Sequence, residues 1–399
     1  MTVFADDILE DLDLSRAEPG PGYLERLFLR FNERVPFETA SKILRQASVA
    51  DPAEKPRFAD VFWSDRLETG TGGTCFARVA AFGALLDDLG FRSRLALGRV
   101  GKDFDHAALF VETSSGTVIC DVGFPFPALL PARPGRVETG LGALAVEETA
   151  RGYRIVFEDG VPLGPRQVEV FAAAVSGDAF RTHWEATFKP TSTFLADVIA
   201  QKTLENRRLA FLRGEVRVDD RHSRTRIPLA APRSHALEEI FGIGAEVLEA
   251  AFAIAGDPEP ERDFSSVDVY LESPVSADEA FAAIASPDGY RALLEGVAEV
   301  ATSTTGPASW TARLLRPEGS SAAEILETVE ADAAAHTLRV RRGAQETSYR
   351  AEEHEGSPWL VRTGVLEGRR TDLLRNDSMR GRLAGSLAVD LLGWARRLG

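Results

Sequence analysis

The chain contains little cysteine and little histidine, which limits the catalytic chemistry available to it. Its 399 residues include two cysteines, Cys75 and Cys120, and six histidines. Two cysteines cannot build a disulfide framework, so the composition fits the reducing cytoplasm, where we expect the protein to be located. Few clusters other than one around Cys75 or Cys120 can therefore supply a thiol or an imidazole.

The sequence also lacks the features of membrane and nucleic-acid-binding proteins. No apolar run approaches the length of a membrane span, and residues 1–14 contain several acids but no secretory leader. The formal net charge is −15. Because an acidic surface repels phosphates, we expect neither nucleic acid nor membrane as a partner.

What remains is a globular composition, with 44% hydrophobic and 27% charged residues, in a chain long enough for two or three domains. Apolar residues recur at helical spacing up to about residue 90, with a break at Val35-Pro36, because the residue before a proline disfavours the α region. Further along, Thr193 to Gln201 is predicted to be a helix that begins with a threonine cap.

Cys75 follows a paired glycine in Gly72-Gly73-Thr74-Cys75-Phe76 and begins a predicted helix. This helix ends near Gly90, a favourable residue just past a helix terminus. A cysteine at a helix start experiences the positive end of the helix dipole and free backbone N–H groups, and both favour the thiolate. The paired glycines let the backbone pass close to a bound acyl group.

His106 and Asp121 lie at opposite ends of a predicted β-hairpin, with strands at 106–112 and 117–121. A two-residue loop at 113–114 would place them opposite each other, whereas a four-residue loop at 113–116 would place His106 opposite position 123. Both registers put the two side chains on one face of the sheet, and an odd-length loop would separate them.

A cysteine, a histidine and an aspartate in this order describe a thiol nucleophile, its base and the group that orients the base. Cys75 would lose its proton to His106, Asp121 would stabilise the imidazolium, and backbone N–H groups would bind an oxyanion. Spacing alone leaves open a buried structural cysteine, a core histidine and a turn aspartate. Cys75, Cys120 and His106 lack paired metal-ligand spacing, so we expect no metal.

The residues around these positions resemble the arylamine N-acetyltransferase family over about residues 1–255. The matching segments are Val35-Pro36-Phe37-Glu38, Gly72-Gly73-Thr74-Cys75-Phe76, Asp105-His106 and Asp121-Val122-Gly123-Phe124, with weaker matches at Thr191-Ser192-Thr193-Phe194 and Leu237 to Gly242. The resemblance implies that Cys75, His106 and Asp121 are the catalytic triad of the family.

The resemblance further implies a papain-like thiol-enzyme core with a helical bundle (1–90), a β-barrel (91–185) and an α/β lid (186–255). The implied reaction is ping-pong transfer of an acyl group from acetyl-CoA or another acyl-CoA to a small-molecule amine. The residues implied to bind substrate are Phe37, Gly73, Thr74, Gly123, Phe124 and Phe126, with the three phenylalanines as an aromatic wall of the acceptor pocket.

The chain departs from the family pattern close to the nucleophile. Thr71, Thr74 and Ala77 stand where the family commonly has arginine, tyrosine and glutamate, and Thr39 replaces an asparagine. The triad is complete, so thiolate chemistry is retained. The missing charged and aromatic groups leave the choice of acyl donor and acceptor open.

Residues 256–263 are rich in proline and charge, which predicts a linker before a domain at 264–399. A strand at 267–272, a capping box at Ser276 to Glu279 and six strands between 297 and 366 follow. A long helix is predicted from about Asp372, with an apolar stripe of Leu383, Leu387, Leu391, Trp394 and Leu398. This order resembles the START-like, polyketide-cyclase-related (SRPBCC) helix-grip fold, which implies an apolar cavity for a hydrophobic ligand.

The sequence therefore predicts an α+β multidomain enzyme that transfers acyl groups through a Cys75 thioester. Two other interpretations stay open. A transglutaminase-like or papain-like thiol hydrolase, or an amide synthase, would use the same Cys-His-Asp order. A non-catalytic protein that binds a hydrophobic ligand in its C-terminal domain would fit the departures at Thr71, Thr74 and Ala77.

Overall fold

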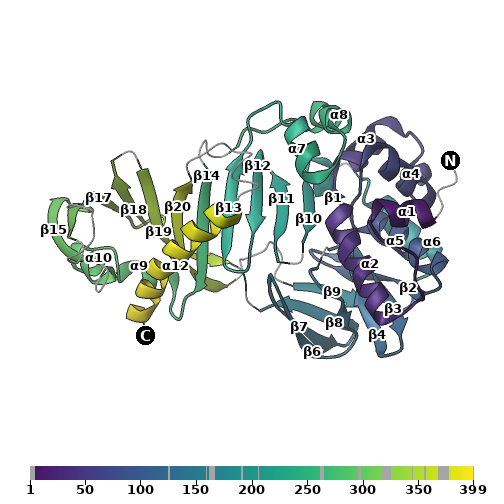
Figure 1. The fold of residues 1–399 in the computed structure, drawn as a ribbon, viewed down its shortest axis with the longest axis horizontal. Helices are drawn as coiled ribbons and strands as arrows, with labels where there is room; N and C mark the ends of the chain where they lie inside the picture. The colour runs from purple at the N-terminus through teal and green to yellow at the C-terminus, as the bar shows by residue number, and fades with distance from the viewer. Residues whose placement is uncertain are drawn as a thin grey trace. The chain divides into compact units, whose positions relative to one another are not determined.

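The structure of the protein is a computed structural model. It describes residues 5–124, 126–158, 160, 167–189, 192–204, 206–260, 265–294, 298–315, 325–343, 345–354, 356–366 and 377–398. The chain forms two compact units (Figure 1). The first unit comprises Met1–Arg221 with Leu229–Glu261, and the second comprises His222–Pro228 with Arg262–Gly399.

Helices dominate the start of the first unit. They are α1 (Ala5–Asp11), α2 (Pro21–Arg34), α3 (Ala40–Ser48), the 3₁₀ turn η1 (Pro52–Glu54), α4 (Ala59–Thr69) and α5 (Cys75–Asp88). Helix α2 begins with a proline in its first turn and ends before Val35-Pro36, as the conformational limits of proline require. Helix α4 ends at Gly70, whose φ of 71° is the left-handed conformation that glycine adopts without strain.

An antiparallel sheet of eight strands follows and forms a near-closed barrel, in the order β5-β4-β3-β2-β9-β8-β7-β6. Its strands are β2 (Arg92–Arg99), β3 (Asp103–Thr113), β4 (Gly116–Cys120), β5 (Leu130–Pro131), β6 (Gly135–Thr139), β7 (Gly142–Thr149), β8 (Gly152–Phe157) and β9 (Gln167–Phe171). Helix α5 packs against β2 and β3. One hydrophobic core joins the helices to this sheet, so the helix that begins at Cys75 is anchored on both sides.

The remainder of the first unit contains α6 (Gly177–Ala186), η2 (Thr193–Leu195), β10 (Ala200–Thr203), β11 (Arg208–Leu212), β12 (Glu215–Asp219), α7 (Ser234–Phe241) and α8 (Ala245–Ala255). The prediction of a helix at 193–201 is wrong, because that segment is a 3₁₀ turn followed by β10. Strand β10 pairs with β1 (Phe37–Glu38), with Phe37 opposite Gln201. This long-range pairing outweighs the local helical pattern.

The second unit contains an antiparallel sheet in the order β13-β14-β20-β19-β18-β17-β16-β15. Its strands are β13 (Ser223–Pro228), β14 (Ser265–Glu272), β15 (Glu299–Gly306), β16 (Ser309–Leu315), β17 (Ile325–Asp332), β18 (Thr337–Arg342), β19 (Gln345–His354) and β20 (Ser357–Leu366). Strand β13 falls inside the predicted lid at 186–255, yet it pairs with β14, with Ser223 opposite Val269.

Within the described part of this unit, three helices accompany the sheet: α9 (Ala277–Ala282), α10 (Pro287–Leu293) and α12 (Asp377–Leu398). The capping box predicted at Ser276 and Glu279 is present. Helix α12 contacts β14 and β20 and buries Leu387, Leu391 and Trp394 of the predicted stripe. The predicted start of this helix near Asp372 and the last part of the predicted linker, 261–263, lie outside the described residues.

Candidate active site

Cys75 is the first residue of α5, and Thr74 occupies the N-cap position with an extended backbone. The Cys75 side chain is buried, at 5% exposure, and its sulfur lies 3.8 Å from the carbonyl oxygen of Asp105. The thiol therefore lies at the positive end of a helix dipole and next to the residue that precedes His106. The other cysteine, Cys120, is fully buried in β4, and burial raises the pKa of its thiol well above the ordinary value.

His106 and Asp121 form a buried pair in which Nε2 of His106 lies 2.7 Å from Oδ2 of Asp121. In the hairpin Thr113 pairs with Gly116 and Leu109 with Cys120. This is the register that places position 106 opposite position 123. The second oxygen of Asp121 accepts a hydrogen bond of 2.8 Å from the backbone N–H of Phe124, which holds the carboxylate in place.

The pair leaves Nδ1 of His106 available on its other side. Burial lowers the pKa of His106, but the charge and hydrogen bond of Asp121 and the contact with Cys75 raise it, to a net value of about 10. An imidazole in this setting holds a proton strongly.

A local irregularity positions His106. The register between β2 and β3 shifts after Gly98, which pairs with His106. In the intervening turn the carboxylate of Asp105 accepts hydrogen bonds of 2.8 to 3.0 Å from three backbone N–H groups, those of Val100, Gly101 and Lys102. Bulges of this kind commonly re-aim a side chain beside an active site.

Gly123 provides the close approach between the two catalytic segments. A Cβ atom at this position would lie 2.4 Å from the carbonyl oxygen of Ala107, 2.9 Å from Cβ of Cys75 and 3.2 Å from Cε1 of His106. Any larger residue would therefore push the cysteine away from the histidine.

The Pro-Phe-Glu segment and the paired glycines are two strands of one local structure. Phe37 forms a parallel bridge with Gly73, through a hydrogen bond of 3.2 Å from the N–H of Glu38 to the carbonyl of Gly73 and one of 3.3 Å from the N–H of Gly73 to the carbonyl of Pro36. Both motifs are thus needed to hold the loop that leads to Cys75.

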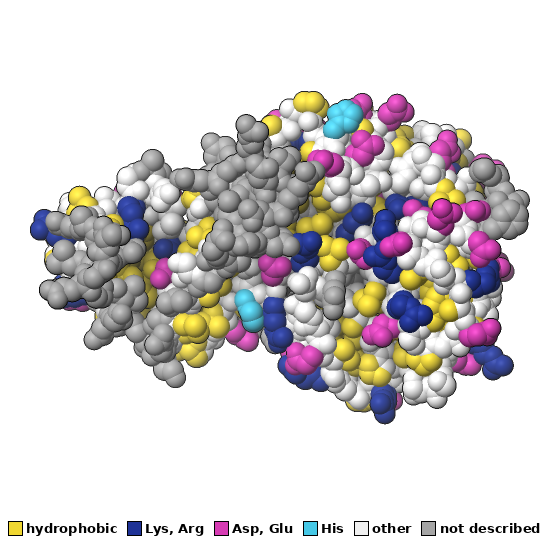
Figure 2. All heavy atoms as spheres, in the orientation of Figure 1, with side chains coloured by type: hydrophobic (Ala, Val, Ile, Leu, Met, Phe, Trp, Pro, Cys, Tyr) yellow, Lys and Arg dark blue, Asp and Glu magenta, His cyan; other side chains and the backbone are white. Residues whose placement is uncertain are grey.

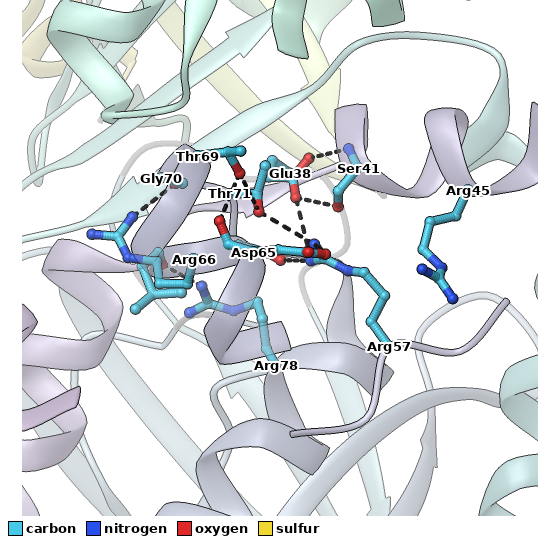
Figure 3. A network of polar contacts seen from close by, with 12 residues as sticks. Glu38, Ser41, Arg45, Arg57, Asp65, Arg66, Thr69, Gly70, Thr71 and Arg78 are labelled. Carbon is cyan, nitrogen blue, oxygen red and sulfur yellow. Dashed lines mark hydrogen bonds and ion pairs between the residues drawn. The ribbon is translucent and has the colours of Figure 1, made fainter. Parts of the chain in front are cut away.

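Arg57 connects this loop to two acids (Figure 3). Its guanidinium donates to Thr71 Oγ1 at 3.2 Å and to the carbonyl oxygen of Gly72, and it pairs with Asp65 at 2.8 Å and with the fully buried Glu38 at 3.9 Å. The chain lacks an arginine at position 71, and Arg57 reaches the same loop from the segment after α3. Sequence analysis did not identify Arg57, although threonine in place of the family's common arginine at position 71 pointed to a change in this loop.

Arg78, one turn after Cys75, is a second residue that sequence analysis missed. It is fully buried and donates to the carbonyl of Val122 at 2.7 Å, to that of Val35 and to the side chain of Asn32 at 2.8 Å. It therefore ties the loop after Asp121 to the helix of Cys75. An arginine inside the apolar run of 75–86 was the available signal.

The three phenylalanines expected in an acceptor wall occupy different environments. Phe37 is half-buried and contacts Phe194, with ring centroids 5.5 Å apart. Phe124 is half-buried and lies 5.0 Å from Phe126. Phe126 is buried in the core and stacks on Phe157 at 5.4 Å.

Charges of both signs are interspersed on the face of the first unit that Figure 2 shows. Within the described residues, no group of three His, Cys, Asp or Glu side chains is arranged to hold a metal ion. In the same part of the chain, no helix has the length and apolarity needed to cross a membrane.

The N-acetyltransferase family model matches residues 22–249, which is more than half of the chain. The chain belongs to the arylamine N-acetyltransferase family. It is thus an acyltransferase of that family. No curated protein matches its sequence.

Solved arylamine N-acetyltransferases share the fold of this family member. The M. tuberculosis enzyme is 20% identical, with 59% of this chain and 91% of that chain covered at a TM-score of 0.51. The Mycobacterium marinum enzyme in complex with CoA is 20% identical, with 61% of this chain and 96% of that chain covered at a TM-score of 0.51. The Bacillus cereus enzyme is described as having a Cys-His-Glu catalytic triad. It is 18% identical, with 61% of this chain and 100% of that chain covered at a TM-score of 0.52. At these identities the likeness shows the fold.

Proposed function

We propose that the first unit transfers an acyl group, with acetyl as the expected one, from a CoA thioester to an arylamine through a thioester on Cys75. The observation that carries this proposal is the buried His106–Asp121 pair beside a cysteine at a helix N-terminus. The name of the family and the CoA bound by the M. marinum enzyme support the donor and the acceptor.

The reaction has two halves. In the first, the Cys75 thiolate attacks the thioester carbonyl, a new C–S bond forms, and the CoA thiolate leaves with a proton from His106. In the second, the amine attacks the Cys75 thioester, gives a proton to His106, and the Cys75 thiolate is released with the amide. Asp121 stabilises the imidazolium in both halves.

Further positions complete the proposed site. Gly73 and Gly123 let the backbone approach the acyl group. Thr74 lies next to Cys75 at the N-cap of α5, and N–H groups at the start of this helix bind the oxyanion. Phe37 and Phe124 offer half-buried rings to the acceptor. For Phe126, whose side chain is buried against Phe157, we propose support of the Phe124 ring as its contribution to the aromatic wall.

We also propose the domain assignment. Residues 1–255, apart from β13, which pairs with β14 of the second unit, would form the papain-like core with a helical bundle, a barrel and an α/β lid. A linker at 256–263 would follow. Residues 264–399 would form the helix-grip domain that binds a hydrophobic ligand. The contacts of α12 with β14 and β20 support this assignment. The cytoplasmic location stays a prediction.

Intact-mass measurement after incubation with a panel of acyl-CoAs tests the transfer. We expect one acyl adduct on the wild type and none on Cys75→Ala, while Cys120→Ala behaves as the wild type because Cys120 is fully buried. Addition of an arylamine should discharge the adduct as an amide. Discharge to the free acid at the same rate with and without amine would indicate a thiol hydrolase instead.

The reactivity of the thiol gives an independent test. We expect iodoacetamide to label Cys75 well below the pH that an ordinary thiol requires, and acetyl-CoA to slow the labelling. Ordinary thiol reactivity, together with no adduct from any acyl-CoA, would favour the non-catalytic interpretation.

A further inference from the structure

A small cationic pocket opens beside the start of α5. Four of its lining side chains are basic, namely Lys42, Arg45, Lys55 and Arg57, and Thr74 and Ala77 contribute the side nearest the nucleophile. Lys42 is 5% exposed, Lys55 9% and Arg57 4%, so these charges are held away from bulk water. We call this cavity the Lys42 pocket.

Three of the four cations already have partners in the protein. Arg57 pairs with Asp65 at 2.8 Å, the Lys55 ammonium donates to the Gln46 side chain at 2.8 Å, and Arg45 donates to the backbone carbonyl of Lys55 at 3.0 Å. These contacts fix the walls of the pocket.

Lys42 is different. Among the described residues its ammonium has neither an ion pair nor a hydrogen bond, and it contacts two aromatic rings, lying 5.0 Å from the centroid of Phe188 and 5.9 Å from that of Phe194. A buried ammonium without an anion carries a large desolvation cost, which aromatic faces offset only in part.

We propose that Lys42 binds a carboxylate group of a substrate beside Cys75. This inference rests on the proposed acyl transfer and narrows its substrate class, because either the acyl group or the amine acceptor then carries an acid group. The pocket commits the ligand to a small anion, since its volume of about 10 Å³ has room for about one water-sized group. One oxygen of a carboxylate can occupy such a space, with the rest of the ligand outside it.

The position of Lys42 ties it to the reacting centre. Thr74, in the wall of the pocket, directly precedes the nucleophile. Burial lowers the pKa of Lys42 to about 8, and the charge of Cys75 opposes that shift, so the two groups interact electrostatically. Phe194, which Lys42 faces, in turn contacts Phe37 of the proposed acceptor wall.

Iodoacetate and iodoacetamide provide a direct probe, because the two reagents differ in size by little and only iodoacetate carries a carboxylate. We expect Cys75 to show a higher iodoacetate-to-iodoacetamide rate ratio in the wild type than in Lys42→Met, by about 10-fold or more. Lys42→Arg should restore the ratio. Lys202→Met is the matched control, because burial also lowers the pKa of Lys202 to about 8 and Lys202 does not line the pocket.

The pH dependence of this ratio gives a second readout. The charged and titratable groups that face Lys42 are Arg45, Lys55 and Arg57 from the pocket and Cys75 from α5. The two arginines keep their charge in this range, and the pKa of His106 is about 10. The iodoacetate preference should therefore fall as the pH rises through about 8, where Lys42 loses its proton, and Lys42→Met should lack this step.

Matched substrates then distinguish the two sources of the carboxylate. The donor arm compares acylation of Cys75 by malonyl-CoA against propionyl-CoA and by succinyl-CoA against butyryl-CoA. The acceptor arm compares 4-aminobenzoate with aniline. In one of these two comparisons we expect the wild type to react about 10- to 100-fold faster with the acidic substrate than with the neutral one. Lys42→Met should remove that preference.

Two results would overturn the inference: an iodoacetate ratio that is the same in Lys42→Met and wild type, or equal preferences in both substrate arms. Failure of the acyl transfer itself would look different. Cys75 would then form no adduct with any acyl-CoA, while the Lys42-dependent iodoacetate preference would still be measured.

Discussion

Both units of the protein bury charged side chains, but the first unit also holds two that are paired less completely than Asp268 of the second. In the second unit the fully buried Asp268 is surrounded by partners, with Arg226 at 2.9 Å, Thr363 at 2.7 Å and Arg350 at 3.9 Å. In the first unit Arg57 and Arg78 are also partnered. His106, however, has one acidic partner, Asp121, and the Lys42 ammonium faces aromatic rings.

This difference separates charges that stabilise from charges that react. A buried ion that is fully paired has no capacity left for a ligand, whereas one left open costs folding free energy that the rest of the fold has to offset. The incompletely paired His106 and Lys42 both lie near the start of α5, where Cys75 is expected to react. The complete pairing of Asp268 agrees with a structural role for this residue.

The largest expected effect comes from removing the charge of Asp121 in its pair with His106. Asp121→Asn should lower kcat by about 10⁴-fold, because a neutral amide neither fixes the tautomer nor stabilises the imidazolium. The pKa of His106 should fall, so iodoacetamide labelling of Cys75 should need a higher pH. Steady-state kinetics and labelling rates measure both effects. Unchanged labelling with lost activity would place the role of Asp121 elsewhere.

Removal of the paired charge of the second unit should change stability instead. Asp268→Asn leaves Arg226 and Arg350 without their buried anion, so we expect a loss of about 3–5 kcal/mol in the free energy of unfolding, with acylation of Cys75 retained. Denaturant unfolding measures the loss. Asp288→Asn is the control, because Asp288 forms an exposed ion pair with Arg291, whose removal should cost under about 0.5 kcal/mol.

The sign of the pH dependence follows from the same contacts. Burial raises the pKa of Asp268, but Arg350, Arg226 and Thr363 together lower it by more than burial raises it. The net pKa therefore lies below the ordinary value. The stabilisation is present above the unfolded pKa of about 3.9 and is lost as the pH falls through the folded pKa. The difference in the free energy of unfolding between wild type and Asp268→Asn should therefore become smaller below about pH 4. A constant difference would contradict this assignment.

Gly123→Ala sharpens the comparison by disturbing geometry without changing charge. The added methyl group would clash with the carbonyl oxygen of Ala107 and with Cβ of Cys75. Because the Ala107 oxygen is a backbone atom, relieving the clash requires a shift of the main chain. We expect kcat/KM to fall by about 100-fold and stability to fall by about 2 kcal/mol. Gly135→Ala is the control, since a Cβ atom there meets nothing within 4 Å. Equal activity of the two variants would count against a positioning role for Gly123.

The smallest expected effect concerns Arg57, whose guanidinium contacts the loop at Thr71 and Gly72. Arg57→Ala should lower kcat/KM by about 10-fold, because the loop of Gly72 loses its anchor and Glu38 its cation. Adding Thr71→Arg in the same chain should recover part of the loss. Kinetics of the single and double variants measure the coupling. Simple additivity of the two changes would mean that the positions do not substitute for each other.

Much of the site was readable from short stretches of sequence. The helix that begins at Cys75 follows from its glycines and apolar stripe, and the structure has it at Cys75–Asp88. The hairpin pattern placed His106 and Asp121 on one face, and the structure has them in contact. The capping box at Ser276 is a local signal of the same kind. In each case the residues that interact are close in the chain or related by a single turn.

The tertiary structure decided the rest, because the deciding contacts join segments that are far apart. Helical spacing at 193–201 gave way to the pairing of β10 with β1, and β13 pairs with a strand about forty residues further along the chain. Arg57 and Lys42 come from different segments and meet beside the loop of Gly73, and Arg78 reaches the loop after Asp121. The sequence by itself identified Cys75, His106 and Asp121 as the groups expected to react. Burial and long-range packing determined which charges were left open beside them.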